Sequence, residues 1–261
     1  MVKSNRKSRI CRSIGRDPVA PKDVVISVGP KLILFIQTVM IFFLIYPNDD
    51  SILNSNKEYH VLIKIFPIVS LIVFVILNGM KLSNIYTYPR RIMVGLMFSM
   101  VGDILMVYKE EYLLYGIFSF AMAHIYYSLA FGIIPSNHPK SATLIACTIF
   151  FIVRIMHPYL INEDFIKFVF LHVYASIIGY MCWRSIVRVN FLNDLWSWTK
   201  LSGCIGAILF FMSDIILCYN IFAEPIYESH KVIMITYYAG QMCIALSVVD
   251  YRVDYLLNKQ N

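Results

Sequence analysis

Residues 95–108 read GLMFSMVGDILMVY, a run apolar enough to lie in a membrane that nevertheless contains a carboxylate, Asp103. A charged side chain at the centre of a bilayer costs about 2.5–3.5 kcal/mol on insertion scales, so such a residue is a candidate for a functional site. The run recurs after a shift of 111 residues: residues 206–219 read GAILFFMSDIILCY, which places Asp214 at the position of Asp103. We therefore interpret the rest of the chain as the scaffold that positions two aspartates inside the membrane.

The composition is typical of a membrane protein. Of the 261 residues, 59% are hydrophobic and 15% are charged, whereas a soluble domain is about half apolar and a quarter charged. A helix needs roughly 17–25 apolar residues to cross a bilayer, and backbone groups in lipid must be hydrogen-bonded within helices. We predict an all-α protein, a polytopic bundle of eight transmembrane helices. The expected spans are 30–46, 61–78, 91–108, 112–134, 141–156, 165–183, 198–218 and 231–249.

Basic residues predict the orientation. Seven Lys and Arg lie in residues 1–26, which we expect to be a disordered cytosolic tail without the pattern of a cleavable signal peptide. With that tail inside, most other Lys and Arg also fall in inner segments, so both termini should be cytosolic. The membrane domain is expected at 27–250 and a short polar tail at 251–261. The net charge of +7 comes largely from the N-terminal tail, so no nucleic-acid partner is expected. The endoplasmic reticulum membrane is the default location, and the oligomeric state is not predicted.

The 111-residue offset also relates a second pair of helices. It carries Tyr126 and Tyr127 onto Tyr237 and Tyr238. Two helix pairs that match in one register indicate a parallel internal repeat of four plus four helices. The identities are few, and chance similarity between two apolar segments is the alternative.

Asp103 and Asp214 are the first candidates for chemistry. As packing residues, each would be a protonated carboxyl hydrogen-bonded at a helix interface. As functional residues, the two would face a shared cavity at similar depth. A low dielectric and a neighbouring carboxyl both favour the neutral acid, so one aspartate could be a neutral acid while the other stays ionised, as in other acid–base pairs.

Other polar residues stand within the predicted spans. Lys64 either extends along the helix toward the membrane surface or pairs with an aspartate or a lipid phosphate. His124 is either an interface group or a member of the site. His124 and Tyr127 are three residues apart, as are Tyr238 and Gln241, so each pair shares one helix face.

Most recognised catalytic and metal-binding motifs are absent from the sequence. It has no HExxH, no GxSxG, no glycine-rich phosphate loop and no EF-hand pattern. None of the six cysteines forms a CxxC pair, and most lie in or beside apolar runs. We predict no metal and no cofactor.

Six motifs follow one another along the chain: KIFP (64–67), GLMFSMVGDIL (95–105), YGIFSFAMAHIYY (115–127), YMCWR (180–184), FFMSD (210–214) and YYAGQ (237–241). Their order and spacing resemble the YhhN-like, or lysoplasmalogenase, family of multi-pass membrane proteins. The resemblance implies an eight-helix bundle that hydrolyses the vinyl ether bond of lysoplasmalogen, a membrane lysophospholipid. The products would be a fatty aldehyde and glycerophosphoethanolamine or glycerophosphocholine. Carried over by motif, the implied catalytic residues are Asp103, Asp214 and His124, and the implied substrate-binding residues are Lys64, Tyr127, Tyr238 and Gln241.

The chemistry of a vinyl ether suits a pair of carboxyl groups. Protonation of the β-carbon gives an oxocarbenium ion, water adds, and the hemiacetal collapses to aldehyde and alcohol, which parallels two-carboxyl glycoside hydrolysis. Three alternatives stay open. They are another intramembrane lipid hydrolase, which could depend on a metal, a proton-coupled transporter, and a lipid-binding protein without turnover.

Overall fold

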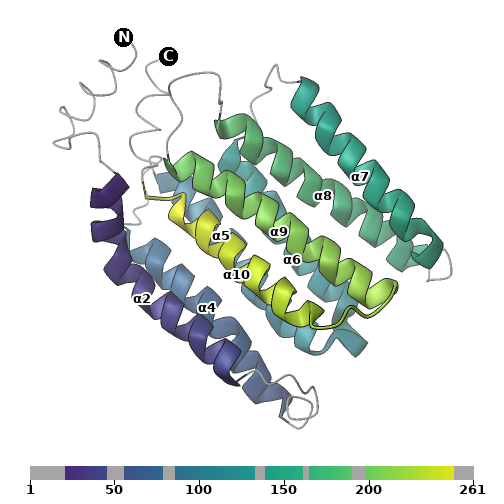
Figure 1. Cartoon of the computed structure of the whole chain (residues 1–261), viewed down its shortest axis with the longest axis horizontal. Helices are drawn as coiled ribbons and strands as arrows, with labels where there is room; N and C mark the ends of the chain where they lie inside the picture. Colours follow the sequence, from purple (N-terminus) through teal and green to yellow (C-terminus); the bar gives the residue numbers. More distant parts are fainter. Residues whose placement is uncertain are drawn as a thin grey trace.

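The computed structural model describes residues 21–45, 56–78, 86–132, 139–160, 165–189 and 198–249, and these are helical apart from short turns and connections. The helices run alongside one another in one bundle (Figure 1). The all-α prediction is confirmed. The eight helices of the described residues are α2 (Pro21–Ile45), α4 (Lys57–Leu77), α5 (Thr87–Val107), α6 (Lys109–Phe131), α7 (Pro139–Leu160), α8 (Phe165–Val189), α9 (Trp198–Phe222) and α10 (Ser229–Leu246).

Five of the described helices, α2, α4, α6, α8 and α9, are long and apolar enough to cross a membrane. The outer surface carries large apolar side chains such as Leu44, Tyr115 and Phe165, which are 79%, 66% and 78% exposed. Lipid is the solvent that tolerates such a surface. The chain is therefore a multi-pass membrane protein.

The three remaining helices are less apolar or have a shorter apolar stretch. The apolar part of α7 is the shorter segment Ile145–Leu160. Helix α5 carries Arg90 and Arg91 near its start and contains Asp103, while half of the residues of α10 are buried against other helices. A helix that faces protein rather than lipid needs a narrower apolar surface. The prediction of eight spans therefore stays a prediction.

Helices α5, α6, α9 and α10 occupy the middle of the bundle. Helices α2 and α4 lie along one edge and α7 along the opposite edge (Figure 1). Helix α5 packs against α4 and α6, α6 against α8, and α9 against α8 and α10. Only Tyr108 separates α5 from α6, so these two helices form a tight antiparallel hairpin.

Two glycines that the 111-residue offset relates both lie at close contacts. A Cβ atom on Gly206 would stand 2.7 Å from the carbonyl oxygen of Gly240, so α9 and α10 touch backbone to backbone. A Cβ atom on Gly95 would stand 2.2 Å from the ring of Tyr127, so α5 makes room for an aromatic side chain of α6. The neighbours of the two glycines differ, and the internal repeat stays a prediction.

One predicted boundary is wrong. Helix α2 begins at Pro21, so residues 21–26, which we assigned to a disordered tail, are helical. Proline fits the first turn of a helix because it has no N–H to leave unpaired there. The remainder of the predicted tails, residues 1–20 and 251–261, lies outside the described residues.

Candidate active site

Asp103 is buried in an arrangement that uses both of its carboxylate oxygens. The Nζ atom of Lys64 on α4 lies 3.6 Å from Oδ1, and the hydroxyl of Tyr237 on α10 donates a hydrogen bond to Oδ2 at 2.6 Å. Asp103 is only 2% exposed. Three helices therefore meet at one carboxylate, and a buried charge has the cationic partner that it needs. We call Lys64, Asp103 and Tyr237 the first cluster.

Asp214 lies in a second cluster with His124 on α6 and Tyr174 on α8. The Tyr174 hydroxyl donates a hydrogen bond to Oδ2 of Asp214, and Nε2 of His124 is 2.9 Å from the same hydroxyl and 3.4 Å from Oδ2. Because the proton of Tyr174 points to Asp214, the remaining contacts fit an Nε2 that carries hydrogen. The other nitrogen, Nδ1, is buried and has no hydrogen-bond partner within the described residues.

A phenylalanine contacts both clusters. The ring centre of Phe210 on α9 is 4.6 Å from that of His124 and 5.2 Å from that of Tyr237. Phe210 therefore lies between the two clusters, and each carboxylate keeps its own partners. The structure therefore brings the aspartates into one region and gives them different surroundings.

Three other predicted residues bond to protein partners. The hydroxyl of Tyr127 donates to Oε1 of Gln241 at 2.8 Å, and that of Tyr238 donates to the backbone oxygen of Lys64 at 2.9 Å. All three predicted side chains are buried. Tyr238 thus holds the turn of α4 that presents Lys64. Gln241 keeps a buried Nε2 without a hydrogen-bond partner among the described residues.

A small cavity of about 90 Å³ adjoins the second cluster. Its walls are mostly apolar side chains of α6, α8 and α9, and its polar lining comes from Tyr174, Asp214 and Cys218. The space is large enough to admit water. Asp103 does not line it. We predicted one cavity lined by both aspartates, but of the two only Asp214 lines this cavity.

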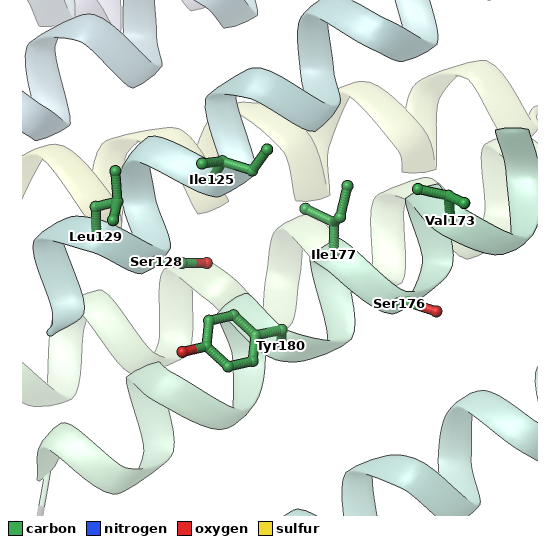
Figure 2. A pocket seen from close by; sticks show the side chains of 7 residues that line it. All are labelled: Ile125, Ser128, Leu129, Val173, Ser176, Ile177 and Tyr180. Atoms are coloured by element: carbon green, nitrogen blue, oxygen red, sulfur yellow. The ribbon is translucent and has the colours of Figure 1, made fainter. Parts of the chain in front are cut away.

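A larger groove of about 420 Å³ lies between α6 and α8 (Figure 2). Ile125 and Val173 line one part of it, and they neighbour His124 and Tyr174 in the sequence. The groove therefore lies beside the α6–α8 contact that the second cluster makes. Its full lining is Ile125, Ser128 and Leu129 from α6 and Val173, Ser176, Ile177 and Tyr180 from α8.

The structure adds two residues that the sequence prediction did not include in the site. Tyr174 and Tyr237 each bond to an aspartate. Spacing along one helix could not find them, because each aspartate lies on a different helix from its tyrosine. A weak signal existed for Tyr237, which the 111-residue offset aligns with Tyr126 in the sequence. No comparable signal existed for Tyr174.

Within the described part of the chain, no three His, Cys, Asp or Glu side chains are grouped as metal ligands would be. The donors that the structure places around the two aspartates are one ammonium, one imidazole and two phenols. All of these groups can hold or move protons.

The sequence is similar to known proteins along most of its length. The profile of the YhhN family matches residues 59–248. The chain is 33% identical over 246 residues to lysoplasmalogenase TMEM86A of Bos taurus, covering 92% of this chain and 99% of the relative. It is 33% identical over 248 residues to lysoplasmalogenase TMEM86A of Homo sapiens, covering 93% and 100%.

A second kind of relative is similar along less of its length. Lysoplasmalogenase TMEM86B of Sus scrofa is 31% identical over 222 residues, covering 85% of this chain and 87% of the relative. No solved structure matches the chain. Since the family profile spans both aspartates and most of the helical bundle, this chain belongs to the YhhN family.

Proposed function

We propose that this protein is a lysoplasmalogenase, an ether-bond hydrolase that cleaves the vinyl ether of lysoplasmalogen to a fatty aldehyde and glycerophosphoethanolamine or glycerophosphocholine. The curated relatives that carry this name match almost the whole chain. The observation that supports the proposal most directly is Asp214, a carboxyl group beside a histidine and a tyrosine at the wall of a mostly apolar cavity.

Asp214 is the better placed of the two aspartates to act as the acid. Both contacts of its cluster are made to Oδ2, so Oδ1 is left to carry a proton toward the cavity. Transfer of that proton to the β-carbon of the vinyl ether gives the oxocarbenium ion. The carboxylate that remains at Asp214, together with the nearby Asp103, stabilises the positive charge by electrostatic attraction.

His124 has the group needed for the water step. Its buried Nδ1 is unpartnered within the described residues and can accept a proton from the water that adds to the oxocarbenium carbon. The resulting hemiacetal then breaks its bond to the glycerol oxygen, which takes up the proton held by His124. The hemiacetal hydroxyl gives its proton to the Asp214 carboxylate as the carbon becomes the aldehyde, and both side chains return to their starting states. Lys64 and Tyr237 act on Asp103, which they hold in place.

The test is aldehyde release by purified protein from 1-alkenyl lysophosphatidylethanolamine, with the matching 1-acyl lysolipid as a second substrate. We expect aldehyde from the alkenyl lipid, and loss of turnover in a folded Asp214→Asn variant. Free fatty acid from the acyl lipid would replace the proposal with a general lysolipase. Wild-type turnover in folded Asp214→Asn would remove Asp214 from the acid role.

We also propose that all eight helices cross the endoplasmic reticulum membrane with both termini in the cytosol, in a domain built as a parallel repeat. The clustering of Arg91, Arg184 and Arg188 at one end of the bundle supports this orientation. A glycosylation acceptor fused to either terminus should stay unmodified, while one inserted in the connection 223–228 should be modified. The opposite pattern would reverse the orientation.

A further inference from the structure

The small cavity beside Asp214 is apolar along almost its whole wall. Apart from Asp214, Tyr174 and Cys218, its lining consists of aliphatic, phenylalanine and methionine side chains. The side chain of Asp214 is 13% exposed, whereas that of Asp103 is 3% exposed. Of the two carboxyl groups, Asp214 is therefore the more accessible to a bound molecule, and that molecule would meet mostly apolar surface around it.

The cavity extends from Asp214 toward the C-terminal end of α9. Asp214, Cys218 and Phe222 follow one another at intervals of four residues, so they share one face of the helix, and all three line the cavity. Phe222 is the last residue of α9. The rise along the helix from Asp214 to Phe222 is about 12 Å. The cavity is therefore elongated, with Phe222 at one end and the carboxyl group about 12 Å away from it along the helix.

Helix α6 supplies another wall, which runs in the opposite direction along the sequence. Phe120, Ile117 and Leu113 all line the cavity from one face of α6. The ring centre of Phe120 is 6.2 Å from that of Phe210, which contacts the second cluster. Leu113 and Phe222 pack against the same small apolar core, which includes Ile117. Phe120 therefore lies at the end of the cavity near the carboxyl group, and Leu113 lies at the far end with Phe222.

The proposed reaction fixes which part of the substrate lies beside Asp214. The proton goes to the β-carbon of the vinyl ether, and the alkyl chain is bonded to that carbon, whereas the glycerol oxygen is bonded to the α-carbon. An acid must reach the atom that it protonates. The first methylene groups of the chain therefore lie next to the carboxyl group, and they need an apolar space that begins there.

We propose that the alkyl chain of lysoplasmalogen lies in this cavity, running from Asp214 past Cys218, and that Leu113 and Phe222 at the far end limit the length of chain that fits. The proposal rests on the proposed function, because it takes Asp214 as the acid. A chain that leaves the bilayer for these walls exchanges one apolar environment for another. Its packing against the walls, rather than its hydrophobicity, therefore decides how tightly it binds.

The test measures equilibrium binding of two lysolipids to the full-length protein in nanodiscs. They are 1-hexyl and 1-dodecyl lysophosphatidylethanolamine, whose saturated ethers are not cleaved by protonation. The extended hexyl chain is shorter than the rise from Asp214 to Phe222, and the dodecyl chain is longer. Each variant is compared with the wild type for the same lipid, so that partition of the lipid into the disc cancels.

Two substitutions narrow the cavity at different distances from the carboxyl group. Cys218→Phe, one helical turn beyond Asp214, should weaken binding of both lipids by about tenfold or more, the size of a typical overpacking penalty. Leu113→Phe should weaken binding of the dodecyl lipid by about tenfold and leave the hexyl lipid at its wild-type affinity. If Cys218→Phe does not fold, Ala175→Phe takes its place, since Ala175 lines the cavity beside Tyr174.

Two further substitutions to phenylalanine serve as controls. Met212 on α9 and Leu44 on α2 are 47% and 79% exposed and lie outside the cavity. Met212→Phe and Leu44→Phe should bind both lipids as the wild type does. A preference between chains that appears in Leu113→Phe and in neither control then reports the end of the cavity rather than a general loss of structure.

Either of two results would overturn the proposal. One is unchanged dodecyl binding in Cys218→Phe or its replacement, and the other is a Leu113→Phe variant that does not weaken the dodecyl lipid more than the hexyl lipid. A failure of the proposed function gives a different pattern, in which binding depends on chain length as expected while the alkenyl lipid releases no aldehyde. In the working enzyme, Leu113→Phe should lower kcat/KM for long alkenyl chains and leave it unchanged for short ones.

Discussion

The hydroxyl of Tyr237 on α10 donates a 2.6 Å hydrogen bond to Oδ2 of Asp103 on α5, 134 positions earlier in the chain. Neither member of this bond lines the small cavity. Since the ring of Tyr237 also packs against Phe120 and Phe210, the hydroxyl can be tested separately from the ring.

Tyr237→Phe should lower the free energy of unfolding by about 1–3 kcal/mol, because it leaves a buried carboxylate oxygen without its donor and keeps the aromatic packing. Thermal unfolding in detergent measures the change. Tyr115→Phe, at a side chain that is 66% exposed, is the control and should be neutral. Equal stability of Tyr237→Phe and the wild type would mean that the hydroxyl contributes nothing to the fold.

Lys64→Met should destabilise the protein by about 3–5 kcal/mol, because it leaves Asp103 as a buried charge without its cation. Adding Asp103→Asn in the same chain should recover part of that loss, since the double variant no longer buries an unpaired charge. Unfolding free energies of the wild type, both single variants and the double variant give the coupling energy. Additive losses would show that the 3.6 Å ion pair is energetically unimportant.

Tyr174→Phe should reduce kcat by roughly 10²-fold while the protein stays folded, because Asp214 and His124 both lose the hydroxyl that positions them. The measurement is steady-state aldehyde release from the alkenyl lysolipid. Tyr159→Phe, on α7 and outside the site, serves as the matched substitution. A Tyr174→Phe enzyme with wild-type kcat would show that this hydroxyl is only structural.

Gly206→Ala should lower the unfolding temperature clearly, because its methyl group would lie 2.7 Å from the carbonyl oxygen of Gly240 and neither backbone can move alone. Overpacking of this kind costs about 1–3 kcal/mol. Gly29→Ala on α2 is the control, since nothing lies within 4 Å of a Cβ atom there. It should be neutral or slightly stabilising because alanine favours helix. Identical unfolding temperatures for the two variants would contradict the close contact of α9 and α10.

The sequence indicated which polar residues lie within the apolar helices, but not which of them contact one another. Asp103, Asp214, Lys64 and His124 were identifiable because a charged or polar residue in an apolar segment is costly wherever it lies. The partners of each aspartate were not identifiable, because they depend on how helices distant in the chain pack together. Tyr174 has no local feature that separates it from any aromatic residue of a membrane helix.

The helices themselves were predictable for a simpler reason. Long apolar segments in lipid have few alternatives to the helix, so the element type followed from composition. The residues at which the helices begin and end were less certain. Residues 21–26 look like a polar tail because Lys22 and Asp23 are charged. Charged residues in the first turn of a helix lie at the membrane edge, however, and need not interrupt the helix.

The single-residue connection at Tyr108 has a mechanical consequence. With one residue between them, α5 and α6 pack against each other along their length, so we expect Asp103 and His124 to move together. Tyr174 is on α8, and Asp214 is on α9. We therefore expect any opening at the second cluster to come from α8 and α9 tilting away from the α5–α6 hairpin. Substrate entry would then displace the tyrosine and one aspartate together, while the other aspartate and the histidine stay where they are.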